Sequence, residues 1–126
     1  MLEDVVIQLG NYCSMRSERH VGTTTVRLAG EFDLACKEPF QEELSLVLDG
    51  ETVTFILDLR GLQFMDSTGL GTLVELDGLA RRDGFEFTIL CDQGLVRRAL
   101  KETGLDGMLP VADPYGGLLP PSDSPV

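Results

Sequence analysis

Hydrophobic and polar residues alternate most regularly at residues 23–30, TTTVRLAG. Val26 and Leu28 alternate there with Thr25 and Arg27, which is the two-residue period of a strand with one buried face. The preceding stretch, CSMRSERHVG, is polar and ends in a glycine. It predicts a weaker strand at an edge of the sheet, paired with residues 23–30 through a tight turn.

Three further strands are predicted. Residues 52–59, TVTFILDL, are nearly continuously apolar, which favours a central strand covered on both faces. Residues 85–91, FEFTILC, alternate and place four side chains on one side: Phe85, Phe87, Ile89 and Cys91. Residues 108–111, MLPV, indicate a short last strand.

Helical periods separate these strands. The first helix is predicted from Phe40, with Pro39 in its first turn, and its apolar face consists of Phe40, Leu44, Val47 and Leu48. The second has a broad apolar arc, interrupted by Asp77, and ends at Gly84; the arc consists of Leu70, Leu73, Val74, Leu76 and Ala80. The third covers about residues 94–103, with Gly104 after its C-cap.

Helices that alternate with strands in this order imply right-handed crossovers in a largely parallel sheet. We therefore predict an α/β fold with a sheet of four to five strands. Residues 1–11 are open to two interpretations, an N-terminal arm or an extra edge strand. Residues 112–126 are rich in Pro and Gly, which predicts a mobile tail after a single domain at residues 12–111.

Charge, hydropathy and cysteine content exclude several classes of function. The formal charge is −11 and the ten basic residues form no stripe, which argues against nucleic acid as a partner. The apolar runs are too short to span a membrane and the N-terminus does not resemble a signal peptide, so we expect a cytoplasmic protein. Cys13, Cys36 and Cys91 include no C-x-x-C pair, which predicts reduced thiols.

The sequence FMDSTGLG, residues 64–71, lies where a strand and its loop, RGLQFMD, give way to a helix. Ser67 falls at or near the start of that helix, where a serine usually caps the backbone N–H groups. Gly69 and Gly71 are poor helix formers, so they indicate close approach of a partner or of another part of the chain.

Enzymatic interpretations of this junction lack supporting residues. A serine nucleophile needs a base, and the only histidine is His20, on the weak edge segment. A phosphate-binding loop needs a different glycine spacing and a lysine. Asp58, Asp66 and Asp92 offer carboxylates to a metal, but no histidine or cysteine joins them. We therefore expect neither an enzyme nor a cofactor.

The segment FILDLRGLQFMDSTGLGTLV resembles the signature of the STAS family, the domain shared by sulphate transporters and anti-sigma factor antagonists. Asp58-Leu59 and residues 64–70 match its strand end and loop, and the upstream element GEFD matches at residues 30–33. The resemblance covers about residues 12–111 and is strongest with the free-standing bacterial antagonists. It implies the STAS fold, with a single mixed, largely parallel sheet packed with helices.

The resemblance also implies a switch between partners. An unmodified antagonist binds an anti-sigma factor that is a GHKL-type serine kinase, and thereby frees a sigma factor. The kinase phosphorylates the first hydroxyl after the motif's aspartate, here Ser67, and a serine phosphatase removes the phosphate. The implied partner-binding residues are Glu31, Asp33, Asp66, Ser67, Thr68, Gly69, Leu70 and Gly71. An alternative within the family is a scaffold or subunit module of a stress-sensing complex or a lipid-transport ATPase.

Overall fold

The computed structural model describes residues 5–112. In chain order the elements are β1 (Val6–Gln8), β2 (Cys13–His20), β3 (Thr23–Phe32), α1 (Leu34–Val47), β4 (Thr54–Met65), α2 (Ser67–Asp83), β5 (Glu86–Leu90), α3 (Leu95–Glu102), the 3-10 turn Leu105–Gly107, and β6 (Val111–Ala112). The predicted α/β class is confirmed. Residues 113–126, which hold the predicted tail except for Ala112, lie outside the described range.

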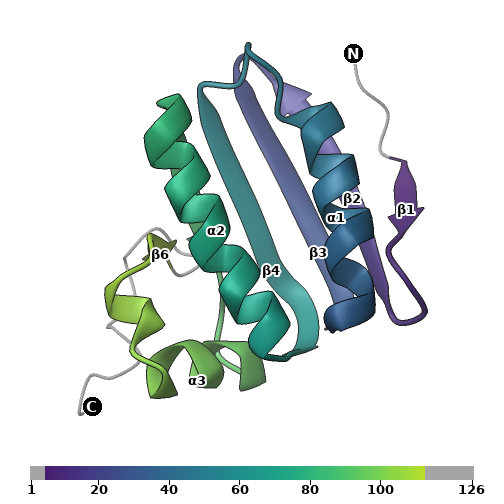
Figure 1. Cartoon of the computed structure of the whole chain (residues 1–126), viewed down its shortest axis with the longest axis vertical. Coiled ribbons are helices and arrows are strands. Elements are labelled where there is room, and N and C mark those ends of the chain that lie inside the picture. The colour runs from purple at the N-terminus through teal and green to yellow at the C-terminus, as the bar shows by residue number, and fades with distance from the viewer. Residues whose placement is uncertain (1–4, 113–126) are drawn as a thin grey trace.

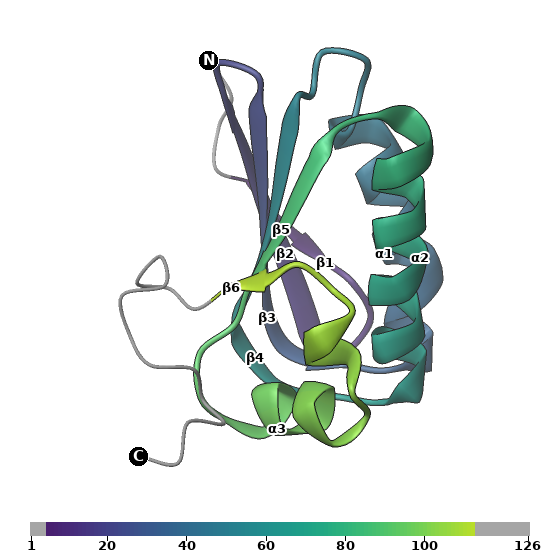
Figure 2. The same ribbon diagram turned by 90° about the vertical axis from the view of Figure 1, so that its left-hand side faces the viewer.

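The strands form one mixed sheet in the order β1-β2-β3-β4-β5-β6 (Figure 1). The pairs β1-β2 and β2-β3 are antiparallel, and the three pairs from β3 to β6 are parallel. Because each parallel connection advances one strand in the same direction, right-handed crossovers place their helices on the same face. Figure 2 shows α1 and α2 side by side on that face, while α3 lies near one end of the sheet.

The sixth strand, beyond the predicted four to five, is β1, while the predicted short last strand forms as β6. At one edge, Val6–Gln8 forms β1, which makes β2 an interior strand instead of the predicted edge. At the other edge only two residues form β6. The predicted tight turn joins β2 to β3 through Val21 and Gly22, both with positive φ, as two-residue hairpins require.

The start of α1 differs from the prediction. The helix begins at Leu34, because the Asp33 carboxylate accepts a hydrogen bond from the Ala35 N–H at 3.1 Å and caps it. Pro39 therefore lies in the second turn and not in the first. Buried residues at four-residue spacing, Cys36, Phe40 and Leu44, hold this helix against the sheet. Their burial offsets the hydrogen bond that a proline cannot donate.

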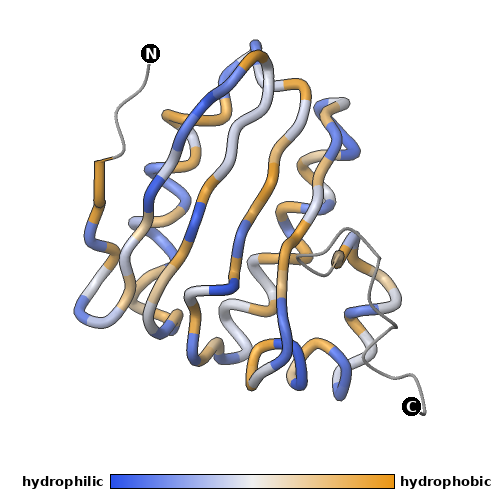
Figure 3. Tube along the Cα trace, turned by 180° about the vertical axis from the view of Figure 1, so that it is seen from behind, coloured by the Kyte–Doolittle hydropathy of each residue, from blue (hydrophilic) through white to orange (hydrophobic). Residues whose placement is uncertain are grey.

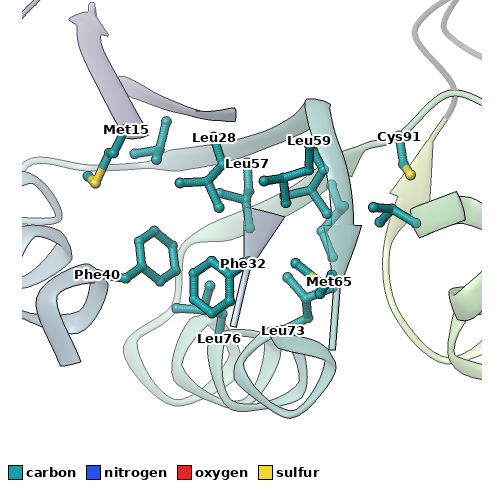
Figure 4. Packing of buried hydrophobic residues seen from close by; sticks show 14 of the residues in the cluster. Met15, Leu28, Phe32, Phe40, Leu57, Leu59, Met65, Leu73, Leu76 and Cys91 are labelled. Atoms are coloured by element: carbon teal, nitrogen blue, oxygen red, sulfur yellow. The ribbon is translucent and has the colours of Figure 1, made fainter. Parts of the chain in front are cut away.

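The core lies between the helices and one face of the sheet (Figure 4). Phe32 at the end of β3 packs edge to face against Phe40 of α1, with ring centroids 5.5 Å apart. The same close-up view shows Met65, at the end of β4, beside Leu73 of α2. The ends of β3 and β4 are therefore fixed by the packing of both helices.

The opposite face of β4 corrects the expectation of a strand covered on both faces. Figure 3 views the sheet from this side, where no helix of the described residues crosses the strands. Asp58, 4% exposed, accepts two hydrogen bonds from the Arg60 guanidinium at 2.8 and 2.9 Å, and Arg27 lies 3.6 Å away. Arg27 also pairs with Glu18 at 2.6 Å. This ion network, not a second layer, covers the middle of the strand.

Burial alone would raise the pKa of the Asp58 carboxyl, but the hydrogen bonds and charges of Arg60 and Arg27 outweigh it and hold the pKa below its usual value of 3.8. Such a carboxylate stabilises the fold above the pKa of the unfolded chain. That contribution is lost as pH falls through the lower pKa of the folded state.

We predict that Asp58→Asn lowers the free energy of unfolding at neutral pH by about 1–2 kcal/mol, because Arg60 loses a charged acceptor but stays partly hydrated. The difference from the parent should shrink as pH falls below about 3.8. Urea unfolding at several pH values measures it, with the exposed Asp92→Asn as control. A difference that grows towards acidic pH would contradict this account.

Candidate functional site

The parallel strands β3 and β4 end side by side and bring the two motifs together. Glu31 pairs with Phe64 and Phe32 with Met65 in the register of the sheet. The Asp66 N–H then donates a hydrogen bond to the Phe32 carbonyl at 3.2 Å, which continues the pairing past the last strand residues. Residues 30–33 and 64–67 thus form one surface at the start of α1 and α2, although they are more than 30 residues apart.

The predicted loop RGLQFMD is wrong in part, because β4 continues to Met65. Its pairing with β3 shifts register between Arg27 and Ala29 and again between Gly30 and Glu31. Gly61 lies at the first shift, where a Cβ would stand 2.8 Å from the Leu28 carbonyl oxygen. The glycine therefore lets the extended strand pass closely alongside β3.

Each strand is followed by an aspartate that caps the next helix. Asp33 caps α1, and the Asp66 carboxylate accepts a hydrogen bond from the Gly69 N–H at 3.1 Å, which caps α2. The expectation that Ser67 itself is the cap is therefore wrong. Asp66 performs that role one residue earlier, since its side chain reaches the third helical residue.

Ser67 is the first residue of α2 and its side chain is exposed. Thr68 is half-buried, and its carbonyl oxygen accepts a hydrogen bond from the Thr72 hydroxyl at 2.8 Å. The first N–H groups of a helix have no acceptor within the helix, and the helix dipole is positive there. The exposed hydroxyl of Ser67 thus lies where added negative charge is favoured.

Gly69 and Gly71 have different surroundings. Gly69 is buried, and a Cβ at this position would overlap Met65 Cγ and stand 3.1 Å from a ring carbon of Phe32. Gly71 is exposed, and a Cβ there would meet no atom within 4 Å. Close approach of the chain itself therefore explains the first glycine, while internal packing does not explain the second.

Glu31 is held by a backbone contact from outside both motifs. Its N–H donates a hydrogen bond to the Tyr12 carbonyl at 2.7 Å. Gly30, immediately before it, has a φ of 103°, and a Cβ there would overlap that same carbonyl oxygen. The glycine of the GEFD motif is thus required by the path of the backbone. Tyr12 was not predicted, because no pattern links it to Glu31.

The buried Cys36 side chain contacts the segment that joins β3 to α1. Its Sγ lies 3.5 Å from Asp33 Oδ1 and 3.6 Å from the Glu31 carbonyl oxygen. Burial raises the pKa of the Cys36 thiol, so the group is protonated and donates to these oxygens. All three cysteines are free, as predicted, and all three are buried.

The remaining predicted residues are more dispersed. Leu70 is half-buried and packs against the core. His20 lies at the far end of β2 from Ser67, so it is not available as a base for that serine. Asp58 belongs to the ion network, and residues 5–112 include no cluster of three His, Cys, Asp or Glu side chains that could hold a metal.

The protein is an α/β module: α1 and α2 cover one face of a mixed sheet, and a serine is exposed at the start of α2. The motifs GEFD and FMDSTGLG lie at the ends of its strands β3 and β4. The STAS domain model matches residues 14–115, and the chain belongs to the STAS family. The resemblance seen in the sequence is therefore confirmed. Within residues 5–112, none of the helices combines the length and apolarity needed to cross a membrane.

Similar proteins within this family are antagonists of anti-sigma factors. An anti-sigma F factor antagonist of Paenibacillus polymyxa is 32% identical over 97 residues, which cover 76% of this chain and 83% of that protein. An anti-sigma F factor antagonist of Lysinibacillus sphaericus is 37% identical over 65 residues, 48% of this chain and 56% of that protein.

Two solved structures share the fold. The crystal structure of an anti-sigma factor antagonist from Mycobacterium paratuberculosis has a TM-score of 0.66 at 23% identity, covering 79% of this chain and 84% of its own. The antagonist SpoIIAA in its unphosphorylated form has a TM-score of 0.66 at 24% identity, covering 79% and 86%. These likenesses confirm the arrangement of strands and helices.

The two glycines of α2 provide a paired test of the site. We predict that Gly69→Val lowers the free energy of unfolding by about 1–3 kcal/mol, because the added methyl groups displace Met65 and Phe32. Gly71→Val should change it by no more than about 0.5 kcal/mol. Chemical denaturation of both variants measures the difference in the free energy of unfolding. Equal effects would show that internal packing does not require a glycine at position 69.

Proposed function

We propose that this chain is an anti-sigma factor antagonist and not an enzyme. In this proposal the unmodified protein binds, in the cytoplasm, an anti-sigma factor that is also a GHKL-type serine kinase, and thereby frees a sigma factor. Phosphorylation of Ser67 ends the binding, and a serine phosphatase restores it. Support comes from the family, from the names of the similar proteins and from the exposed hydroxyl at the start of α2.

The position of Ser67 is the observation that carries the proposal. A kinase needs an acceptor hydroxyl that its active site can reach, and Ser67 is exposed while Thr68 is half-buried. The Asp66 carboxylate, next to it in the chain, is held by the cap of α2, and the Asp33 carboxylate at the neighbouring strand end is held by the cap of α1. The unmodified surface therefore offers the partner a neutral hydroxyl among fixed acidic groups.

Phosphorylation changes this surface much more than it changes the fold. The phosphate adds about −1.5 to −2 charges at neutral pH. At the first residue of a helix the N–H groups and the dipole favour that charge by roughly 0.3–1 kcal/mol. A partner surface that faces a neutral hydroxyl has no such compensation, so the cost falls on the complex.

A pull-down from native cell extract tests the proposal. The unmodified protein, used as bait, should retain a serine kinase that mass spectrometry identifies as an anti-sigma factor, and Mg-ATP should then release it. Retention of transporter or stress-complex subunits in place of a kinase would contradict the proposal and favour a scaffold role.

We predict that Ser67 is the phosphoacceptor. Incubation with the recovered kinase and Mg-ATP should add one phosphate to the parent and to Thr68→Val, and none to Ser67→Ala. The reason is the exposure of the Ser67 hydroxyl compared with that of Thr68. Intact mass and peptide mapping measure the result. Undiminished labelling of Ser67→Ala would show that another residue is modified.

We also predict that Ser67→Asp strongly weakens partner binding and leaves the domain folded. An opposing group at the centre of an interface costs about 2–5 kcal/mol, roughly a 30-fold to several-thousand-fold loss of affinity. Asp carries only about one charge, so the effect should fall at the low end of that range. In the free protein a carboxylate in the first helical turn should change stability by less than about 1 kcal/mol.

Ser67→Asn is the matched control, because it has the size of Asp without the charge. Thermal unfolding and titration against the purified kinase should be compared for both variants. Early unfolding of Ser67→Asp, or binding as tight as that of the parent, would assign Ser67 a structural role instead.

A further inference from the structure

Three large apolar side chains at the end of the sheet that leads to Ser67 are exposed, and none of them is among the predicted partner-binding residues. Tyr12 is 66% exposed, Leu34 71% and Phe64 44%. Single exposed apolar residues are common on protein surfaces, but a group of them beside a candidate site marks an interaction surface. We call these three residues the apolar rim.

Backbone pairing places the apolar rim around the acidic residues of the site. Tyr12 accepts the hydrogen bond of the Glu31 N–H, and Phe64 is the register partner of Glu31 on β4. Tyr12, Glu31 and Phe64 thus lie in adjacent chain segments at the end of the sheet. Leu34 follows the capping residue Asp33 and opens α1. The hydrogen bond from the Asp66 N–H to the Phe32 carbonyl joins the two strand ends, so Leu34 and Ser67 each follow directly on a capping aspartate at the same end of the sheet.

Charge on this surface identifies the kind of partner. Glu31, Asp33 and Asp66 lie among the residues of the rim, so the surface combines apolar side chains with negative charge. A second copy of this chain would bring the same carboxylates face to face, which costs binding energy. A protein surface that presents Arg or Lys around an apolar pocket is complementary to it.

We propose that Tyr12, Leu34 and Phe64 anchor the partner protein, with basic side chains of the partner facing Glu31, Asp33 and Asp66. This inference rests on the proposed function and extends it, because it assigns the binding energy to three apolar residues that are not among the partner-binding residues implied by the resemblance. Desolvated apolar anchors carry most of the affinity of an interface, while charges that stay partly hydrated chiefly set the association rate.

Helix α1 offers a matched pair of leucines for the test. Leu34 and Leu46 lie at opposite ends of this helix and are both 71% exposed. The kinase recovered with the parent is purified and titrated against the parent, Leu34→Ala and Leu46→Ala. Leu34→Ala should weaken binding about fivefold or more, which corresponds to the usual threshold for an interface anchor. Leu46→Ala should bind within twofold of the parent.

Two further measurements extend the test to the rest of the surface. Tyr12→Ser and Phe64→Ser should also weaken binding, while Val53→Ser, at an exposed position just before the other end of β4, should not. The association rate of the parent should fall as NaCl is raised, since opposite charges are screened. Unchanged melting temperatures would show that the variants lose contacts and not structure.

The outcomes separate the two proposals. In one outcome the kinase binds the parent, and the variants at Leu34, Tyr12 and Phe64 bind as well as the control variants at Leu46 and Val53. This outcome overturns the anchoring surface and leaves the proposed function standing. An association rate that salt leaves unchanged overturns the basic partner surface. If the purified kinase does not bind the parent, both proposals fail.

Discussion

The parallel pairing of β3 with β4 is the constraint on which the site depends. It aligns Phe32 with Met65 and extends into the hydrogen bond from the Asp66 N–H to the Phe32 carbonyl. Two motifs far apart in the sequence become one surface only because these strands end at the same level. The burial of Phe32 and Met65 under α1 and α2 fixes that level, since a one-residue slip of either strand would turn its own side chain out of the core.

The chemistry of the surface follows from the way each strand passes into its helix. Asp33 and Asp66 are used as caps, so their carboxylates are held in place, and Ser67 is left as the first helical residue with an exposed hydroxyl. Gly69 allows α2 to start close against Met65. The surface therefore presents two capped carboxylates and one exposed hydroxyl, which is the arrangement on which the proposed function depends.

Local pattern was sufficient to predict the α/β class, the ends of α2 and α3 and the free cysteines, because glycines and helical periods are read within a few residues. It was wrong at Pro39, where the Asp33 cap and the buried Cys36 extend α1 by more than a turn. The extension of β4 to Met65 depends on register shifts against β3, which are a tertiary property. Tyr12 was missed for the same reason, since only the folded chain brings it to Glu31.

The central claim is that one phosphate on this surface decides whether a sigma factor is free. The direct measurement is release of the sigma factor from its purified complex with the anti-sigma factor kinase, followed during titration with this protein in its unmodified and Ser67-phosphorylated forms. The account predicts release by the unmodified form at concentrations comparable to that of the complex, and no release by the phosphorylated form at tenfold excess or so. Equal release by both forms, or by neither, would contradict it.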